Sequence, residues 1–423
     1  MDSVPVNEPV AIVMAAGKST RMKSDTPKIL HELCGQPVLQ YVLDALTQAG
    51  IRRKIVVVGY QADKVKAAFA NTPGVEFVLQ AEQLGTGHAV MVCEPALREH
   101  QGPVVVIAGD QPMIRPELIA DMLRRLKETN SKGLIATAVV PNPFGLGRIL
   151  RDAQGEFVGV VEQKDATPEQ AKINEINPSF YAFDGPLLFD SLRKVRPENA
   201  QKEYYLTDVP GILRTGGHQI VAESLATEAD MCGINHRGHL AEVHRLMQDR
   251  IHQRLFDIGV TIVDPRTTSI DARAEIGQDT IIYPNTVIGG PVRIGRNCKI
   301  GPFAHLRPET ELADGVTVGA FVEVVRSKLG EGTAARHLAY LGDATLGKNV
   351  NVGGGCITAN FDGGVKSQTK IGDNASLGSG SVLIAPVSVG ENATVGAGAI
   401  VTKNDNVPAG ATVVGTPAHP LKK

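Results

Sequence analysis

After Gly259 an aliphatic residue recurs at every sixth position of the chain. A period of six fits neither an α-helix, which repeats about every 3.6 residues, nor an isolated strand, which repeats about every two. It predicts a solenoid with about six residues per side and three sides per coil, in which each coil buries its aliphatic residues and hydrogen-bonds to its neighbours. Two runs share this period: Ile270, Ile276, Ile282, Ile288, Ile294, Ile300, Leu306, Leu312, Val318 and Val324, and then Ile371, Leu377, Leu383, Val389, Val395, Val401, Val407 and Val413.

The period is interrupted between Val324 and Leu346, and again between Val352 and Ile371. Interruptions of a solenoid are typically loops, and loops on a rigid scaffold commonly carry function. Both interruptions are therefore predicted to be loops. The second contains T-A-N-F-D-G-G-V-K, which is rich in turn formers and polar groups.

The first half of the chain has a different pattern. Short apolar runs at residues 10–14, 54–58, 104–108 and 134–140 alternate with segments of helical spacing such as residues 38–46. This alternation predicts an α/β domain with a largely parallel sheet. Apolar residues on one stripe of residues 239–258 predict a single helix, which either connects two domains or belongs to the core of the first. We therefore expect an α/β domain over 1–236, a linker helix over 237–259 and the solenoid over 260–423.

The charge of the chain is nearly balanced, with 43 basic and 45 acidic residues and a formal net charge of −2. We therefore expect no nucleic-acid or membrane partner, and any anionic ligand must be held by local cations. Five cysteines without a C-x-x-C pair argue against a disulfide framework or a zinc site. Together with an N-terminus that lacks a signal-peptide pattern, they favour the reducing cytoplasm.

The first apolar run ends in A-A-G-K-S-T-R-M, residues 15–22, and P-K follows at residues 27–28. A P-loop is excluded, because that motif needs a glycine where the chain has Ile12. A turn of small residues lets main-chain N–H groups approach a triphosphate, and Arg21 and Lys28 would neutralise its charge. The alternative for the turn alone is a structural bend with two surface cations.

Further blocks follow in a fixed order. Residues 104–110 read V-V-V-I-A-G-D, which puts Asp110 at the end of a strand, where ligands bind in open α/β sheets. The remaining blocks are L-Q-A-E-Q-L-G-T-G-H-A (79–89), G-L-G-R-I (145–149), V-V-E-Q-K-D-A (160–166), E-I-N (175–177), E-Y-Y-L-T-D (203–208), C-G-I-N (232–235) and R-H-L-A-Y-L-G-D (336–343).

The first motif resembles the G-x-G-T-R-M signature of sugar-nucleotide pyrophosphorylases, with Ser19 in place of the middle glycine. With the solenoid, the blocks resemble the family of bifunctional N-acetylglucosamine-1-phosphate uridyltransferases and glucosamine-1-phosphate N-acetyltransferases, from about residue 10 to residue 401. The resemblance implies a Rossmann-like nucleotidyltransferase domain followed by a left-handed parallel β-helix of hexapeptide repeats. It also implies a homotrimer, and a cytoplasmic role in making precursors of peptidoglycan and lipopolysaccharide.

For the first half, the resemblance implies transfer of UMP from UTP to N-acetylglucosamine 1-phosphate, with Mg²⁺ held by Asp110 and Asn235. Arg21 and Lys28 would be catalytic, gripping the nucleotide phosphates. The implied substrate-binding residues are Ala15, Ala16 and Gly17 for the nucleotide, Gln80, Gly85 and Thr86 for uracil, and Gly147, Glu162 and Asn177 for the sugar. Ala108 and the run Asn177-Pro178-Ser179 depart from the family pattern.

For the second half, the resemblance implies acetylation of glucosamine 1-phosphate by acetyl-CoA, with His337 as general base and Glu323 as its carboxylate partner. Val325 and Thr416 stand where the family has basic residues, and Phe361 stands where it has a tyrosine. Because neighbouring strand residues face opposite ways, Arg326 is predicted to be no simple substitute for the missing lysine. The implied sugar-phosphate residues are Arg307, Tyr340, Asn351, Asn360 and Lys366, and the implied acetyl-CoA residues are Asn360, Phe361, Ser379 and Ala397.

Two alternatives remain at this stage. One is a nucleotidyltransferase whose β-helix only assembles the oligomer or acts on a different amino sugar. The other is a non-catalytic nucleotide-exchange or regulatory subunit. The second would be favoured by loss of the phosphate and metal residues, and the chain retains Arg21, Lys28, Asp110 and Asn235.

Overall fold

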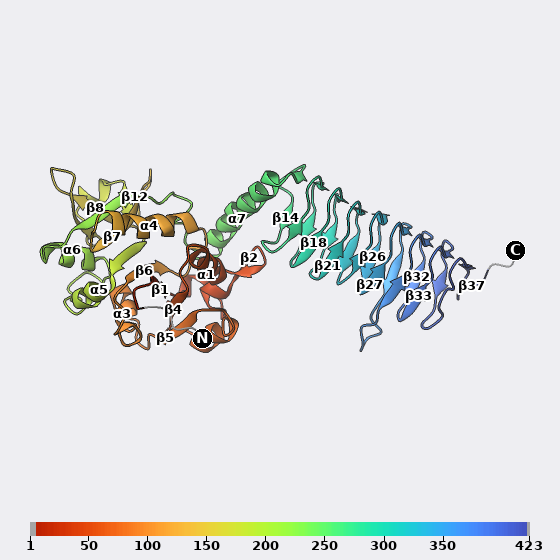
Figure 1. The fold of residues 1–423 in the computed structure, drawn as a ribbon, viewed down its shortest axis with the longest axis horizontal. Helices are drawn as coiled ribbons and strands as arrows, with labels where there is room; N and C mark the ends of the chain where they lie inside the picture. The colour runs from red at the N-terminus through yellow and green to blue at the C-terminus, as the bar shows by residue number, and fades with distance from the viewer. Residues whose placement is uncertain (1–5, 421–423) are drawn as a thin grey trace. The chain divides into compact units, whose positions relative to one another are not determined.

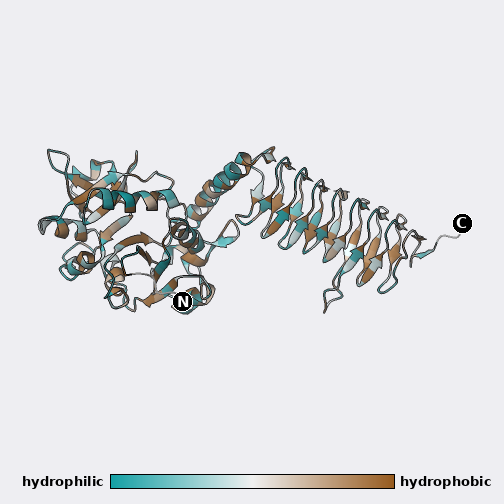
Figure 2. Ribbon diagram, viewed as in Figure 1, coloured by the Kyte–Doolittle hydropathy of each residue, from teal (hydrophilic) through white to brown (hydrophobic). Residues whose placement is uncertain are grey.

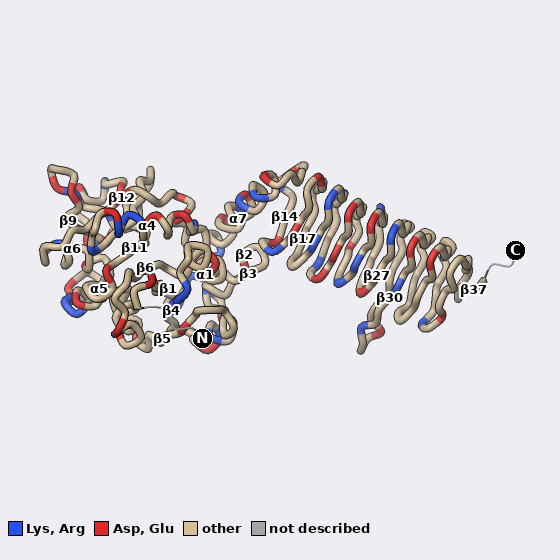
Figure 3. Tube along the Cα trace, in the orientation of Figure 1, with Lys and Arg blue, Asp and Glu red and all other residues tan. Residues whose placement is uncertain are grey.

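The computed structural model describes residues 6–420, which divide into two compact units, one ending at His244 and one beginning at Arg245. The first unit contains a mixed sheet with helices, and the second is a stack of short strands (Figure 1). No helix within residues 6–420 has both the length and the apolarity needed to cross a bilayer. Acidic and basic residues are interspersed along both units (Figure 3).

A ten-stranded sheet organises the first unit, in the order β5-β4-β1-β6-β11-β7-β10-β8-β9, with β12 beside β7. The strands β5, β4, β1 and β6 are parallel, whereas β11 runs antiparallel to both β6 and β7. The predicted parallel sheet therefore forms one half, and antiparallel pairs extend the other. The strands are β1 Val10–Met14, β4 Arg53–Val58, β5 Val75–Leu79, β6 Pro103–Ala108, β7 Gly133–Val139, β8 Gly147–Arg151, β9 Phe157–Val161, β10 Glu175–Asn177, β11 Tyr181–Asp184 and β12 Ile220–Ser224, besides a small pair, β2 Glu32–Leu33 and β3 Gln36–Pro37.

Both faces of this sheet are buried, because successive residues of β1 enter different cores. Val10 and Ile12 belong to one buried cluster, and Ala11 and Val13 belong to the other. Such strands read as continuous apolar runs, which is why the sequence revealed them. The helices that cover the faces are α1 Val38–Gln48, α2 Ala62–Ala68, α3 Thr86–Met91, α4 Pro116–Glu128, α5 Gly185–Leu192 and α6 Asp208–Thr215, with 3₁₀ turns η1 Thr20–Met22, η2 Lys28–Leu30, η3 Glu94–Leu97 and η4 Gln170–Lys172.

The second unit is a parallel β-helix whose coils contribute strands to three sheets. Two-residue strands such as β14, β15 and β16 bury one aliphatic side chain while its neighbour is half-buried or exposed, and hydrophobic segments recur from coil to coil (Figure 2). The first sheet holds β13 Thr261–Ile262, β16 Ile281–Ile282, β19 Lys299–Ile300, β22 Thr317–Ala320, β25 Ala334–His337, β28 Asn351–Val352, β31 Ser376–Leu377, β34 Thr394–Val395, β36 Thr412–Val414 and β37 His419–Pro420. The second holds β14 Ser269–Ile270, β17 Val287–Ile288, β20 His305–Leu306, β23 Glu323–Val325, β26 Tyr340–Gly342, β29 Ile357–Ala359, β32 Val382–Ile384 and β35 Ile400–Val401. The third holds β15 Glu275–Ile276, β18 Val292–Ile294, β21 Thr310–Leu312, β24 Lys328–Leu329, β27 Ala344–Leu346, β30 Thr369–Ile371 and β33 Val387–Val389.

The first interruption of the six-residue period is not a loop, and that prediction was wrong. Leu312 pairs with Leu329, and Leu329 pairs with Leu346, so the ladder continues through the interruption. Each of these coils is one residue shorter than the coil from Ile294 to Leu312, which shifts the phase without breaking the stack. The second interruption is a real loop, lying between β29 and β30.

The predicted helix over residues 239–258 is α7, Arg237–Asp257. Met247, Ile251 and Leu255 are buried on its second half. The Gln248 side chain donates to the main-chain oxygen of Ile270 at 2.7 Å and accepts from the nitrogen of Ile270 at 2.9 Å. Its amide therefore caps the first coil of the β-helix.

Candidate functional site

The loop after β1 carries the predicted nucleotide-binding residues Ala15, Ala16 and Gly17. Gln83 Nε2 donates to the main-chain oxygen of Ala16 at 2.9 Å, which fixes the start of the loop. Farther along, a Cβ added to Gly17 would meet no atom within 4 Å, so the loop is open there. Ser19 takes a left-handed conformation, with φ of 51°, which a glycine adopts without strain. The serine therefore preserves the bend of a glycine-rich loop.

Two cation–oxygen pairs stand beside this loop. Arg21 on η1 donates from Nη2 to Asn235 Oδ1 at 2.9 Å, and the ammonium of Lys28 contacts the carboxylate of Asp110. The nitrogen of Ile234 donates to the main-chain oxygen of Asp110 at 3.0 Å, which holds the segment before α7 against the end of β6. The fold thus brings together two cationic side chains and two side-chain oxygens of the kind that bind metal ions, although the four residues lie far apart in the sequence.

The predicted uracil-binding residues lie where β5 ends and α3 begins. Gln80 is buried, and its Nε2 donates to the main-chain oxygen of Gly85 at 3.2 Å. Gly85 has φ of 112°, and a Cβ there would lie 2.6 Å from the oxygen of Tyr204, so only glycine fits. The Thr86 hydroxyl accepts from the nitrogen of Leu206 at 3.1 Å. The structure thus joins the 79–89 block to the 203–208 block.

The predicted sugar-binding residues come together from three neighbouring strands. Asn177 of β10 pairs with Gly147 of β8, and a Cβ on Gly147 would lie 3.5 Å from Glu162 Oε1. Asn177 is buried; its Nδ2 donates to the Tyr181 hydroxyl at 2.6 Å, and its Oδ1 accepts from the nitrogen of Ser179 at 3.2 Å. Ser179 has a left-handed φ of 69°. The chain therefore makes a sharp turn directly after Asn177.

Glu162 is the carboxyl group of this cluster. Burial raises the pKa of its carboxyl, and the negative charges of Asp165 and Asp208 raise it further. A hydrogen bond from Thr207 and the charge of Arg148 act in the opposite direction. A hydrogen bond donated by a hydroxyl group of a bound ligand would stabilise the ionised form of this carboxyl group.

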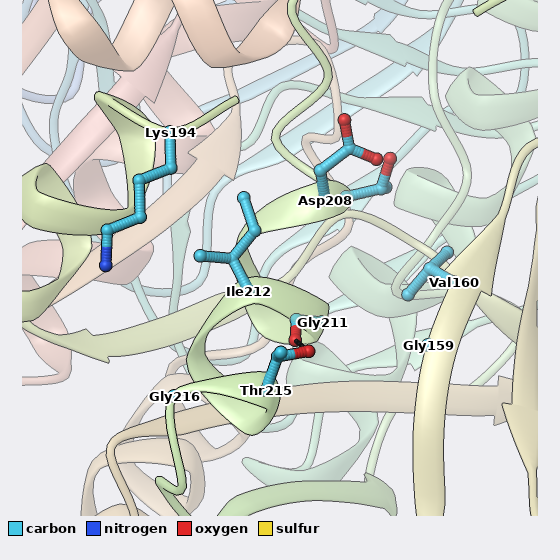
Figure 4. A pocket seen from close by; sticks show the side chains of 9 residues that line it. Gly159, Val160, Lys194, Asp208, Gly211, Ile212, Thr215 and Gly216 are labelled. Carbon is cyan, nitrogen blue, oxygen red and sulfur yellow. Dashed lines mark hydrogen bonds between the residues drawn. The ribbon is translucent and has the colours of Figure 1, made fainter. Parts of the chain in front are cut away.

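A pocket of about 530 Å³ opens between β9 and α6. Figure 4 shows Asp208, Ile212 and Thr215 of α6, with Val160 of β9 to one side of them and Lys194 to the other. Thr207 lines the pocket and also hydrogen-bonds to Glu162, so the pocket adjoins the predicted sugar site without including Gly147, Glu162 or Asn177.

In the second unit, His337 ends β25 and lies on a corner of the β-helix. The nitrogen of Gly355 donates to the oxygen of Leu338 at 2.8 Å, and a Cβ on Gly354 would lie 3.7 Å from His337 Cβ. The same corner continues through Gly380, which donates to Gly354, and Gly398, which donates to Ser379. The predicted base His337 and the predicted acetyl-CoA residues Ser379 and Ala397 therefore lie along one corner of successive coils, which we call the corner line. Asn351 lies on β28, in a sheet that adjoins this corner.

Glu323 and Tyr340 are neighbours in the β23–β26 ladder, on the sheet that adjoins this corner. The Glu323 carboxylate accepts from Arg307 Nη1 at 3.0 Å. Within residues 6–420 no hydrogen bond joins Glu323 to His337. In the free protein, the carboxylate is thus held by the predicted sugar-phosphate arginine.

A second ion pair supports the loop between β29 and β30. Arg326 donates to both carboxylate oxygens of Asp343, at 2.7 and 2.9 Å, and the Asn360 amide contacts the same carboxylate. These donors, Arg326 first, hold the pKa of Asp343 below its ordinary value. Beyond Asn360, Phe361 and Lys366 form an antiparallel bridge across the loop.

The alternation argument for Arg326 does not hold. Strand β23 ends at Val325, and Arg326 has a left-handed φ of 47°, so the two side chains are not successive residues of one strand. Val325 is only 2% exposed. Arg326 remains no simple substitute for a lysine, but the reason is that Asp343 already holds its guanidinium.

Sequence reasoning did not single out Arg148, Gln163 or Asp343. Arg148 is 1% exposed, on the strand that begins with Gly147. An arginine inside an apolar strand, next to a predicted site residue, was the signal that could have found it.

Comparison with known proteins agrees with both architectures. The MobA-like NTP transferase domain matches residues 11–200, the bacterial transferase hexapeptide (six repeats) matches 273–307 and 291–326, and the hexapeptide repeat of succinyl-transferase matches 368–403. The chain is 42% identical to the Bifunctional protein GlmU of Heliobacterium modesticaldum, over 96% of this chain and 94% of that protein. It is 44% identical to the GlmU protein of a Geobacillus species, over 89% of each chain, and 42% identical to that of Geobacillus thermodenitrificans, over 96% of this chain and 95% of that protein.

The Rossmann-like nucleotidyltransferase domain and the left-handed hexapeptide β-helix predicted from the sequence are thereby confirmed. So is the expectation of a bifunctional enzyme that joins a uridyltransferase to an acetyltransferase. The chain belongs to the GlmU family.

Proposed function

We propose that uridyl transfer takes place between the Gly17 loop, the paired residues Arg21, Lys28, Asp110 and Asn235, and the Glu162 cluster. The observation that carries this proposal is the gathering of two cations and two oxygen donors beside an open loop. An oxygen of the sugar phosphate attacks the α-phosphorus of UTP, a new P–O bond forms, and the bond to pyrophosphate breaks. Arg21 and Lys28 offset the phosphate charge and keep the reacting groups in line.

The side chains of Asp110 and Asn235 fit a magnesium ion. Both offer oxygen donors, and Mg²⁺ is commonly held by one or two protein oxygens, with water and substrate phosphates completing its shell. Among residues 6–420 no group of three or more His, Cys, Asp or Glu side chains is placed to hold a metal. The ion would supply charge neutralisation at the phosphates, while Lys28 and Arg21 would be freed to bind them.

Substrate selection is assigned to the two clusters flanking the phosphates. Gln80, Gly85 and Thr86 are proposed to hold uracil, and Gly147, Glu162 and Asn177 to hold N-acetylglucosamine 1-phosphate. The left-handed Ser179 and the buried Asn177 support the second assignment, because they fix the edge of the cluster.

Acetyl transfer is assigned to the corner line of the β-helix. His337 accepts a proton from the amine of glucosamine 1-phosphate as the amine nitrogen attacks the thioester carbonyl, and CoA leaves as its thiol. Glu323, Arg307, Tyr340, Asn351, Asn360 and Lys366 are proposed to hold His337 and the sugar phosphate, with Asn360, Phe361, Ser379 and Ala397 along acetyl-CoA. The continuity of the corner from His337 to Ala397 supports this assignment.

A homotrimer is proposed from an apolar ridge on the β-helix, formed by Phe303, Phe321 and Leu338. All three occupy left-handed positions, where asparagine and glycine are common and bulky residues rare. Their side chains are 49%, 60% and 63% exposed, and the two phenyl rings stack with centroids 5.0 Å apart. Exposed apolar side chains on a strained backbone are expected where another protein surface covers them. We assign that covering surface to other copies of this chain.

The functional domains are proposed as residues 1–236 for uridyl transfer, 237–259 as the linker helix and 260–423 for acetyl transfer. The five cysteines are all free thiols, which supports a reducing, cytoplasmic location.

Both activities can be tested on the full chain. We expect pyrophosphate release from UTP, Mg²⁺ and N-acetylglucosamine 1-phosphate, and free CoA thiol from acetyl-CoA and glucosamine 1-phosphate. Absence of pyrophosphate with a panel of sugar phosphates would overturn the first assignment. Absence of thiol with a panel of amino sugars would leave the β-helix an assembly role.

A further inference from the structure

Arg148 is a buried cation without a carboxylate partner among the described residues. Its side chain is 1% exposed, on β8 directly after Gly147. Nη1 contacts the main-chain oxygen of Leu146, and Nη2 donates to Gln163 Oε1 at 2.8 Å and to the oxygen of Ala171 at 3.2 Å. Nε has no hydrogen-bond partner within residues 6–420. Burying an unpaired charge is costly, so a guanidinium in this place needs an explanation beyond packing.

Arg148 contacts the turn before β8 directly through Leu146 and indirectly through Gln163. Gln163 Oε1 accepts from the nitrogen of Gly145 at 3.0 Å as well as from Arg148, and Arg148 itself contacts Leu146. Gly145 has φ of 85°, so the chain reverses sharply there. Arg148 and Gln163 therefore fix both sides of the turn that delivers Gly147 to Glu162 and Asn177.

The charge of Arg148 also acts on the carboxylate of the same cluster. Glu162 is surrounded by Asp165 and Asp208, which raise its pKa, by the Thr207 hydroxyl and by Arg148, which lower it. The positive charge of Arg148 thus offsets part of the increase in the Glu162 pKa that burial causes. Because no carboxylate neutralises Arg148 by direct contact, its field reaches Glu162 without being cancelled nearby.

We propose that Arg148 and Gln163 are positioning residues for the sugar phosphate, because their hydrogen bonds fix the 145–147 turn that presents Gly147 to Glu162 and Asn177. This rests on the proposed function, in which Gly147, Glu162 and Asn177 hold the sugar. Neither residue contacts the reacting phosphates in this assignment. Their influence is therefore on recognition of the sugar substrate and not on UTP.

The test compares Arg148→Met, Gln163→Ala and a control, Arg151→Met, in the full chain. Arg151 lies on the same strand but is paired with Glu175 at 2.7 Å, outside the cluster. Loss of charge-assisted hydrogen bonds predicts that Arg148→Met and Gln163→Ala raise KM for N-acetylglucosamine 1-phosphate about tenfold. KM for UTP should change less than about twofold in both variants. Acetyl transfer serves as an internal control for folding and should not change.

The dependence of kcat/KM on pH separates the effect of the 145–147 turn from the effect of the Arg148 charge. Without Arg148 the pKa of Glu162 rises, so Arg148→Met moves the acid limb of kcat/KM for the sugar substrate to higher pH, and Gln163→Ala leaves it in place. Equal increases in both KM values, or a profile of Arg148→Met identical to that of Arg151→Met, would overturn the proposal. If Arg148→Met does not fold, an unchanged sugar KM in Gln163→Ala still overturns it. A wild-type chain inactive on this sugar phosphate contradicts the proposed function instead.

Discussion

The ammonium of Lys28 contacts the carboxylate of Asp110 in the free protein. Arg21 and Asn235 repeat the arrangement at 2.9 Å, so each proposed phosphate-binding cation is paired with a proposed metal ligand. In the proposed complex, phosphate oxygens of UTP would bind the two cations and Mg²⁺ would bind the two side-chain oxygens, so both ligands favour opening of the same pairs. Binding of nucleotide and binding of metal are therefore expected to strengthen one another.

Asp110→Asn should lower kcat/KM for uridyl transfer at least about a hundredfold, because a neutral amide holds a divalent cation poorly. Pyrophosphate release over a magnesium titration measures the effect. The control is Asp121→Asn, whose carboxylate pairs with Arg124 on the surface of α4. Equal magnesium dependence in Asp110→Asn and wild type would show that Asp110 is not a ligand.

Glu162→Gln should weaken the sugar substrate and stabilise the free protein at neutral pH. The folded-state pKa of this carboxyl is raised, so the folded state binds a proton more tightly than the unfolded state, and stability falls as pH rises through that window. Removing the charge removes this cost, while loss of a charge-assisted hydrogen bond raises KM for the sugar phosphate about tenfold or more.

Thermal melting between pH 4 and 8, beside steady-state kinetics, checks both parts of the Glu162 prediction. Wild-type melting temperature should fall relative to Glu162→Gln as pH increases. A constant difference across that range would mean that the carboxyl is not the group whose burial costs stability.

His337→Asn should lower acetyl transfer about a hundredfold or more, the usual contribution of a positioned general base. Asparagine fills similar space but accepts no proton at neutral pH. Thiol release from acetyl-CoA is the measurement, and uridyl transfer by the same preparation is the control, expected at the wild-type rate. If His337→Asn retained full acetyl transfer, the general base would have to be another group.

The β-helix was predictable because its constraint is local and repeated. Each coil must present an aliphatic residue, such as Ile288 or Val395, at the same place. The phase change at Leu329 was misread as a loop, because a coil can lose one residue at a corner while its strands stay in register. Corner geometry depends on φ values that hydrophobic spacing does not encode.

The proposed sugar-binding cluster could be suggested only through the resemblance, since Gly147, Glu162 and Asn177 become neighbours through pairing of β8 with β9 and β10. The contribution of Arg148 was missed because its charge suggests a surface position, whereas the fold buries it. Arg326 was misjudged for a related reason. Its direction is decided by a left-handed corner, not by strand alternation.

Asp343→Asn should destabilise the β-helix by about 1–2 kcal/mol, because Arg326 and Asn360 lose a charged acceptor. The pKa of Asp343 is lowered in the folded state, so its stabilisation is complete above the ordinary value of 3.8 and is lost as pH falls below it. Melting temperatures of wild type and variant should therefore differ by several degrees at pH 7 and converge progressively as the pH falls below 3.8. A difference that persists undiminished in acid would exclude the ion pair as its source.

Phe321→Asp should convert the proposed trimer to smaller species and reduce acetyl transfer while sparing uridyl transfer. Burying a carboxylate in each apolar ridge is costly. Loss of an aromatic contact at the centre of an interface typically costs about 2 kcal/mol or more of binding free energy, which is roughly thirtyfold in the dissociation constant. Light scattering after gel filtration gives the mass, and Phe144→Asp, at an exposed phenylalanine of the first unit, is the control. A Phe321→Asp protein that remains trimeric at low concentration would place the interface elsewhere on the β-helix. If it becomes monomeric yet keeps full acetyl transfer, each acetyl-transfer site must be complete within one chain.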